Sequence, residues 1–178
     1  MKKNTHTADG LNGVKAAFGP ELAKASILVV DDEIGMRHFL KKTLADKCRL
    51  VDVAGTPAEA SECLDGKSYD VIMLDNIMPG MTGLEWLADQ WQIGLRSDII
   101  LMTAYADLDT AIEALRLGVS DFLLKPFHSN QVLNAISKSL AKTELKRQNS
   151  VLRQELAAGS DLLRQRDSFI GSSQVAQA

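Results

Sequence analysis

The chain of 178 residues carries 20 basic and 23 acidic side chains, and 46% of its residues are apolar. These proportions exclude a collagen-like or wholly disordered chain and favour one soluble domain with appendages. No apolar run approaches the length of a membrane span, and no apolar segment follows the basic N-terminus, so we expect a cytoplasmic protein without membrane contact. Cys48 and Cys63 have neither metal-site spacing nor a secretory context, so we expect reduced thiols.

The negative charge is concentrated in the middle of the chain. Residues 26–141 have a net charge of −7, whereas residues 1–25 and 142–178 each have +2. Because nonspecific binding to a phosphate backbone requires a basic surface, we expect no nucleic-acid binding by this chain alone.

Five short apolar runs alternate with amphipathic stretches, which is typical of βα units around a parallel sheet. Three of the runs are almost continuously apolar, as strands covered on both faces are, whereas the second alternates and suits an outer position. We therefore expect an α/β domain whose strands lie at 27–31, 50–53, 71–75, 99–103 and 122–124.

The stretches between these runs carry helix signals. Residues 36–44 repeat apolar side chains at helical spacing. Thr56 and Thr82 each precede a glutamate by three residues, which is the pattern of a capping box. Asp107 is expected to cap a further helix, and the last helix is expected to begin near Ser129.

The last helix is predicted to continue through residues 142–168 as a helical linker. Part of it has the spacing of a coiled-coil seam, formed by Leu145, Asn149, Leu152 and Leu156. The seam is shorter than two heptads, so a coiled-coil homodimer and a plain solvated linker both stay open. Residues 159–161 are expected to end or kink this helix. Residues 1–25 are expected to form a mostly flexible extension with one short helical candidate at residues 21–25.

Polar side chains stand at the carboxyl ends of four predicted strands, and these ends share one edge of a parallel sheet. They are Asp31, Asp32, Asp75, Thr103 and Lys125. Three carboxylates brought together repel one another, and oxygen ligands at an open site favour Mg²⁺ as the counter-charge. One aspartate could then attack a phosphoryl group to form an aspartyl phosphate, with Thr103 and Lys125 binding the phosphoryl oxygens.

Each of these residues also has a structural explanation. Asp31 and Asp32 could cap a helix, Asp75 could form a turn, and Lys125 could be an exposed loop lysine. We favour the functional interpretation because different strands place all of them at the same edge of one sheet.

The motifs LVVDDE, VIMLDNIMPGMTGLE, ILMTAY and DFLLKPF, in this order, resemble the receiver domains of two-component response regulators. The resemblance implies a doubly wound, flavodoxin-like sheet of strand order 2-1-3-4-5 and phosphorylation of Asp75 by a sensor histidine kinase. It also implies Mg²⁺ binding by Asp32, Asp75 and the backbone carbonyl of Ile77, with Asp31 contributing through water.

The same resemblance assigns the switch. It implies that Thr103 is the switch hydroxyl, Lys125 the phosphate-binding lysine and Phe122 the switch aromatic. The small Ala104 would keep the approach to the phosphoryl group open, and the bond between Lys125 and Pro126 would be cis. The output surface would be formed by the fourth helix, fifth strand and fifth helix of the family's fold.

A finer resemblance lies in MTAYADLDTAIEALRLGVSDFLLKPF, a long helix and then SFIGSSQ. This order is similar to the regulators that activate sigma-54 RNA polymerase, in which a receiver and a helical linker precede an AAA+ ATPase domain. It implies a receiver at residues 26–141 and the start of a truncated ATPase domain at 169–178. With no P-loop and no helix-turn-helix in the chain, we expect a regulatory region and not an enzyme; DNA and polymerase would be contacted by domains absent here.

Asn76, Ile77 and Thr82 depart from the usual family pattern. Asn76 stands where the family usually has an apolar residue, and this keeps open a receiver-like module that dimerises without phosphorylation. Ile77 and Tyr105 would flank an attacking water without orienting it, so we predict slow self-dephosphorylation.

Two enzymes of the same topology are weaker alternatives. An aspartate phosphatase would need a second aspartate where Ile77 stands. A flavin-binding electron carrier would need a Gly-, Ser- and Thr-rich loop after the first strand, where Asp31 and Asp32 stand instead.

Overall fold

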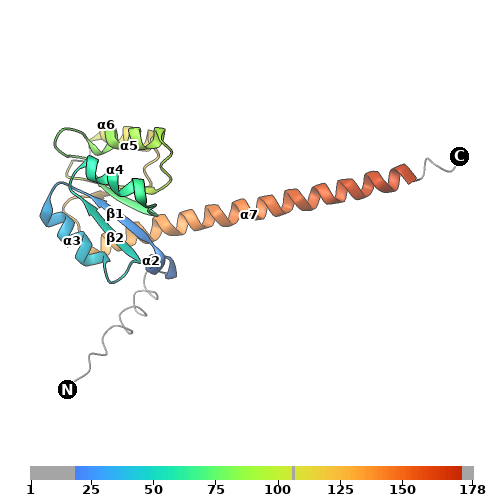
Figure 1. Ribbon diagram of the computed structural model, residues 1–178, viewed down its shortest axis with the longest axis horizontal. Coiled ribbons are helices and arrows are strands. Elements are labelled where there is room, and N and C mark those ends of the chain that lie inside the picture. The colour runs from blue at the N-terminus through green and yellow to red at the C-terminus, as the bar shows by residue number, and fades with distance from the viewer. Residues whose placement is uncertain (1–18, 106, 174–178) are drawn as a thin grey trace, which may run out of the picture. The chain divides into compact units, whose positions relative to one another are not determined.

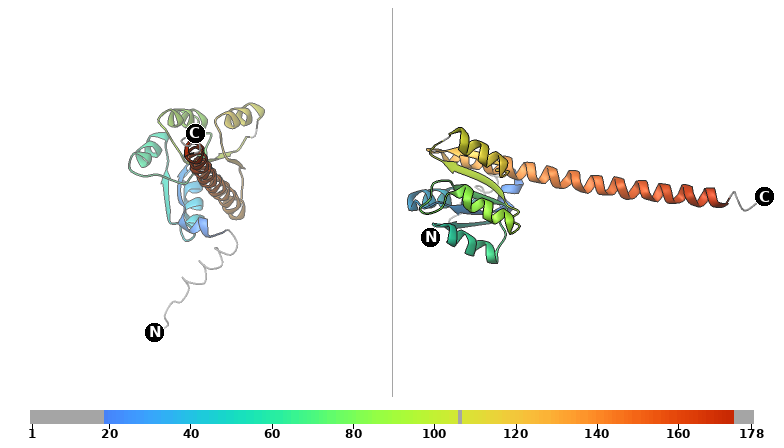
Figure 2. Two further views of the ribbon diagram at one scale, coloured as in Figure 1. Left: turned by 90° about the vertical axis from the view of Figure 1, so that its right-hand side faces the viewer. Right: turned by 90° about the horizontal axis from the view of Figure 1, so that it is seen from above.

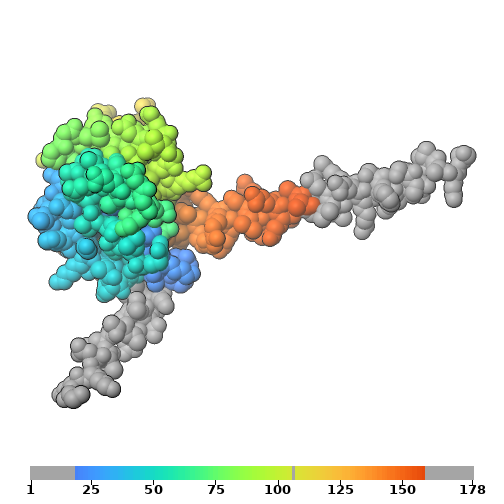
Figure 3. Space-filling view, in the orientation of Figure 1, coloured from blue at the N-terminus to red at the C-terminus, as the bar shows by residue number. Residues whose placement is uncertain are grey.

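The computed structural model describes the backbone of residues 19–105 and 107–173, and the side chains of these residues up to 158, which are coloured in Figure 3. The chain divides into two units, Met1–Ala141 and Lys142–Ala178. The first unit contains the sheet and the candidate site.

Five parallel strands form a single sheet in the order β2-β1-β3-β4-β5, which confirms the predicted doubly wound fold. In register, Ile27 of β1 lies between Val51 of β2 and Val71 of β3. The bounds are Ser26–Val30 for β1, Leu50–Ala54 for β2, Val71–Asp75 for β3, Asp98–Thr103 for β4 and Asp121–Leu124 for β5.

Helices cover both faces of the sheet (Figures 1 and 2). Helix α2, helix α3 and the first part of α7 pack on one face, and α4, α5 and α6 pack on the other. The bounds are Pro20–Lys24 for α2, Ile34–Leu44 for α3, Pro57–Gly66 for α4, Gly83–Gln92 for α5, Leu108–Arg116 for α6 and Ser129–Ser173 for α7.

Strands β1 and β3 are buried along their whole length, as their continuous apolar sequences predict. Because successive strand residues face opposite sides, Ile27 and Val29 join the core under α3 and α7, whereas Leu28 and Val30 join the core under α4 and α5. Each such side chain contributes about 1.5–3 kcal/mol by leaving water. The central strands are therefore a rigid base for the residues that follow them.

The predicted caps are present, with one difference. Thr82 forms a complete capping box with Glu85, and the Asp107 side chain accepts from the backbone N–H of Thr110. At α4 the box is half formed: Thr56 accepts from the Glu59 backbone, but the Glu59 carboxylate accepts from the N–H of Gly55, one residue before the cap.

The prediction of a flexible extension up to residue 25 is wrong for its last part. Residues 20–24 form α2, with Pro20 in the first turn where its missing N–H is not needed. Leu22 is fully buried in the core beside α7. Residues 1–18 of the predicted extension lie outside the described residues.

The prediction that residues 159–161 end or kink the last helix is also wrong. Helix α7 runs without interruption from Ser129 to Ser173. One glycine costs a helix about 1 kcal/mol relative to alanine, which is too little to stop it by itself. The helix also passes residue 169, where an ATPase domain was expected to begin, and residues 174–178 lie outside the described part. Within the described part, no helix is both long and apolar enough to cross a membrane.

Candidate phosphorylation and metal site

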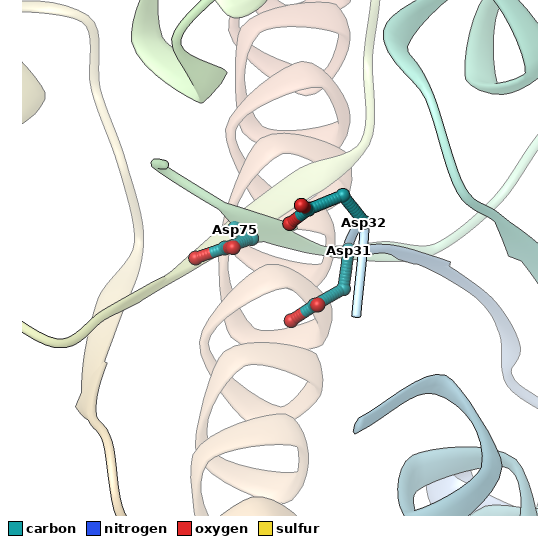
Figure 4. A group of neighbouring side chains, drawn as sticks. All are labelled: Asp31, Asp32 and Asp75. Atoms are coloured by element: carbon teal, nitrogen blue, oxygen red, sulfur yellow. The ribbon is translucent and has the colours of Figure 1, made fainter. Parts of the chain in front are cut away.

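Three aspartates lie together at the carboxyl edge of the sheet, where Figure 4 shows their side chains. Asp31 and Asp32 directly follow β1, and Asp75 ends the neighbouring strand β3. One carboxylate oxygen from each lies within 4.8 Å of the others, and we call these three residues the acidic cluster. Asp31 and Asp75 are buried, whereas Asp32 is exposed and open to an ion arriving from solvent.

Lys125, which follows β5, joins the acidic cluster. Its Nζ atom lies 2.8 Å from Asp31 Oδ2 and 3.2 Å from Asp75 Oδ1. Burial alone would lower the pKa of Lys125, but the hydrogen bonds and charges of these two aspartates outweigh it and raise the pKa. One ammonium against three carboxylates leaves a deficit of two positive charges, which a divalent cation matches.

The surroundings of Asp75 disfavour the charged form of its carboxylate. Burial raises its pKa, Lys125 lowers it, and the charge of Asp31 raises it again, so that the pKa stays above its ordinary value. The backbone N–H of Ile77 also donates to this carboxylate. Anything that adds positive charge beside Asp75 therefore relieves an unfavourable interaction.

Asp31 is already engaged by protein groups on both oxygens. Its Oδ1 accepts from the Glu33 backbone N–H at 2.9 Å, and its Oδ2 accepts from Lys125. This leaves Asp32 and Asp75 as the carboxylates best placed to contact a cation directly. The oxygen-only donor set and the exposed side fit a partly hydrated Mg²⁺ ion.

The predicted switch residues lie beside the acidic cluster. Asp75 is in register with Met102, so Thr103 stands one position beyond it on β4. The Thr103 hydroxyl donates to the Tyr105 carbonyl at 2.9 Å and accepts from the Tyr105 N–H. Thr103 and the half-buried Phe122 of β5 both line an apolar cavity of about 140 Å³.

Comparison with known protein families identifies the family of this chain. Residues 27–137 match the family model of the response regulator receiver domain. The chain is a member of this receiver family. Receiver domains are regulatory and not enzymes, they interact with histidine kinases, and they bind Mg²⁺ at an acidic pocket such as this cluster.

Among curated relatives, regulatory protein AtoC of Escherichia coli K12 is 33% identical over 131 residues, which are 74% of this chain and 28% of AtoC. The DNA-binding transcriptional regulator NtrC of the same strain is 32% identical over 120 residues, 67% of this chain and 26% of NtrC. The chemotaxis protein CheY of Bacillus subtilis is 36% identical over 115 residues, 64% of this chain and 96% of CheY. The chain therefore spans about a quarter of the longer regulators.

Solved structures agree. The chemotaxis protein CheY4 of Vibrio cholerae superposes with a TM-score of 0.61 at 30% identity, over 66% of this chain and 99% of that one. NtrX of Brucella abortus, solved with ADP, gives a TM-score of 0.67 at 26% identity, over 72% of this chain and 30% of NtrX.

The structure places the predicted aspartates and the predicted lysine together, whereas Thr103, Ile77 and Phe122 stand on neighbouring segments. Asp31, Asp32, Asp75 and Lys125 form one cluster, and Thr103 ends the adjacent strand. Ile77 lies in the loop after β3, where its side chain is half exposed. The bond between Lys125 and Pro126 is cis, as the resemblance implies.

Asn76, the residue that departs from the family pattern, has a structural role in this receiver. Its N–H donates to the Met102 carbonyl, its own carbonyl accepts from the Gly83 N–H, and its side-chain oxygen accepts from the Leu84 N–H at 3.3 Å. A side chain at Gly83 would collide with the Asp75 carbonyl oxygen. Asn76 thus ties the loop after Asp75 to the first turn of α5.

The sequence did not indicate one further residue of the receiver's site, Arg37. Its guanidinium donates to the backbone carbonyls of Asp31 and Asp32. An arginine one turn into the helix after an Asp-Asp pair is a weak signal by itself, because its contacts are with backbone atoms that no motif specifies.

Proposed function

We propose that this receiver is a phosphorylation-dependent signalling domain that takes a phosphoryl group from a sensor histidine kinase onto Asp75. The observation that carries the proposal is the acidic cluster with Lys125, where one lysine lies 2.8 and 3.2 Å from two of three crowded carboxylates. A merely structural cluster would be neutralised by protein donors.

In this proposal Asp32, Asp75 and the Ile77 carbonyl hold Mg²⁺, with Asp31 contributing through water. The bound ion supplies positive charge for the phosphoryl oxygens. An Asp75 carboxylate oxygen attacks phosphorus, the bond from phosphorus to the donor's imidazole nitrogen breaks, and the leaving imidazole takes up a proton. Lys125 and Thr103 then bind phosphoryl oxygens, and the small Ala104 leaves room for the approach.

The response would begin at Thr103. To bind a phosphoryl oxygen, its hydroxyl must leave the Tyr105 carbonyl to which it now donates. The apolar cavity beside Thr103 gives the Phe122 ring space to move inward. Such a movement changes the surface of α6, β5 and the start of α7, which is the proposed output surface.

We propose further that the output is control of oligomerisation and of a sigma-54-activating ATPase domain in the cytoplasm. The similarity to NtrC supports this context, and DNA and RNA polymerase would be contacted by domains outside this sequence. A homodimer is supported by the exposure of Leu145, Leu152 and Leu156 in α7, whose side chains are 55–74% exposed.

The test is the intact mass of the protein after incubation with Mg²⁺ and acetyl phosphate, with light scattering on the same samples. We expect one added phosphoryl group that requires both Mg²⁺ and Asp75, and a change in the molar mass measured by scattering. Asp75→Asn and a chelator supply the negative controls, and Asp65→Asn, an exposed aspartate of α4, is the matched variant. A folded protein that gains no phosphoryl group but scatters as a dimer would instead support the module that assembles without phosphorylation.

A further inference from the structure

The loop between β1 and α3 carries two members of the acidic cluster, and a single side chain fastens its backbone. Arg37 of α3 places its Nη1 atom 2.6 Å from the Asp31 carbonyl oxygen and 2.8 Å from the Asp32 carbonyl oxygen. Two successive carbonyls are therefore bridged by one charged donor, and charged donors make the stronger hydrogen bonds.

This contact matters most for Asp32. The carboxylates of Asp31 and Asp75 are held by Lys125, but in the part of the chain that the structure describes no hydrogen bond or ion pair is made by the Asp32 carboxylate. The position of Asp32 therefore depends on its own backbone. The Asp32 carbonyl accepts from Arg37, so the guanidinium fixes the backbone from which this exposed carboxylate projects.

Arg37 is itself confined by the neighbouring loop. A Cβ atom at Gly55 would lie 3.1 Å from the guanidinium carbon and from Nη1, which is tighter than ordinary packing. The Gly55 N–H donates to Glu59 at 2.7 Å, and the Asp31 N–H donates to the Ala54 carbonyl, so this loop is fixed in turn. The guanidinium thus lies between two anchored loops.

Stabilisation of α3 does not explain the residue. Arg37 lies in the fourth position of this helix, near the positive end of the helix dipole, where a cation is unfavourable. The helix has no side-chain cap and no acidic residue in its first turn to offset that charge. The contacts that the structure shows for Arg37 are those with the two carbonyls that it binds.

We infer that Arg37 is a positioning residue that holds Asp32 in place for the divalent cation, acting through the backbone and not by contact with the ion. The inference rests on the proposed function of the acidic cluster. Residues that orient metal ligands from outside typically change metal affinity by about 10- to 100-fold when they are replaced. Lysine at this position keeps the charge but loses the planar, directed donors.

The test is Mg²⁺ binding by isothermal titration calorimetry to the full chain and to R37K, together with the rate of phosphorylation by acetyl phosphate at low and saturating Mg²⁺. We expect Mg²⁺ to bind R37K about tenfold more weakly, the lower end of that range. Phosphorylation should be slower at low Mg²⁺ and recover at saturating Mg²⁺. In a second variant, G55A, the added methyl group crowds the Arg37 guanidinium without removing it. G55A should also weaken Mg²⁺ binding, but less than R37K does.

The matched control is R49K, because Arg49 also donates to a backbone carbonyl, that of Lys24, but at the opposite end of the sheet. R49K should leave Mg²⁺ binding unchanged, and thermal unfolding of both lysine variants without Mg²⁺ should show similar small losses. An R37K Mg²⁺ affinity within twofold of wild type overturns the inference, as does a phosphorylation rate that saturating Mg²⁺ does not restore. A wild type that neither binds Mg²⁺ nor gains a phosphoryl group overturns the proposed function as well.

Discussion

The two ends of the sheet use aspartates in opposite ways. At the amino end, Asp70 accepts from the backbone and the hydroxyl of Ser26 at 2.7 and 2.8 Å, and Asp98 accepts from Ser120 and Ser139. At the carboxyl end, two aspartates of the acidic cluster, Asp31 and Asp75, share one lysine. An aspartate whose oxygens are satisfied by nearby donors is therefore structural, whereas crowded carboxylates stay available for a cation and for chemistry.

The largest effect is expected at the amino end of the sheet, where the oxygens of Asp98 accept hydrogen bonds. Asp98→Ala should lower the free energy of unfolding by about 2–3 kcal/mol, because hydrogen bonds to a charged acceptor are lost and a hydroxyl is left without its acceptor. That hydroxyl belongs to Ser139 of α7, which is 3% exposed. Urea unfolding followed by circular dichroism measures the loss. The exposed Asp65→Ala variant is the control, and an equal effect in both would contradict the assignment.

A smaller effect on stability is expected at the carboxyl end of the sheet, where Asp75 lies in the acidic cluster. Asp75→Asn should raise the free energy of unfolding in metal-free buffer at neutral pH, because it removes a carboxylate whose pKa is raised by burial. Mg²⁺ should raise the melting temperature of the wild type but not of this variant. Thermal unfolding with Mg²⁺ and with a chelator measures both effects.

The pH dependence of that gain has a definite sign. A carboxyl with a raised folded-state pKa is favourable to folding while protonated, and that contribution is lost as the pH rises through the folded-state pKa. The advantage of Asp75→Asn should therefore appear above the ordinary aspartate value of 3.8 and shrink towards zero below it. An advantage that persists unchanged in acid would mean that packing, and not charge, is responsible.

A smaller effect is expected on the lifetime of the phosphorylated receiver. Ile77 and Tyr105, 50% and 70% exposed, offer no group that orients an attacking water well. Ile77→Asn should speed loss of the phosphoryl group by roughly two- to tenfold, less than the hundredfold typical of a full general base. Loss of label in Mg²⁺ after removal of the donor gives the rate. Ile93→Asn, an exposed isoleucine just beyond α5, is the matched control, and wild-type decay within seconds would refute the prediction.

Much of the fold could be predicted because burial repeats along the chain in a simple way. The sequence of β3 is apolar up to its last residue, Asp75, because both of its faces are covered, and the caps at Thr82 and Asp107 are local patterns of four residues. The acidic cluster followed from the same logic, since residues after parallel strands meet at one edge.

The rest depended on contacts that have no local pattern. Leu22 is buried because α2 docks on distant residues of α7, which no local pattern near residue 22 shows. The roles of Arg37 and Asn76 lie in hydrogen bonds to backbone atoms, whose positions are known only once the loops are built. Gly159 resembles a helix stop, but a single glycine is a weak signal when helix-forming residues flank it.

The smallest expected effect tests whether donors really separate the two kinds of aspartate. Asp52 of β2 accepts from Lys67 and from the buried Tyr69, each at 2.7 Å, and these hydrogen bonds lower its pKa. Asp52→Asn should cost about 0.5–1 kcal/mol at neutral pH, since the ion pair is partly exposed and the amide still accepts one bond.

The pH dependence of this loss should be the reverse of that at Asp75. A lowered folded-state pKa gives a stabilising contribution that is present above the unfolded value and is lost as the pH falls through the folded one. Urea unfolding between pH 7 and pH values below 3.8 should therefore show Asp52→Asn destabilised at neutral pH and approaching wild type only below 3.8. Asp75→Asn should start from the stabilised side and approach wild type at higher pH, as the pH falls from the raised folded-state pKa of Asp75 to 3.8. If both substitutions shifted stability in the same direction at neutral pH, the balance between burial and hydrogen-bond donors would not be what divides structural from reactive aspartates in this receiver.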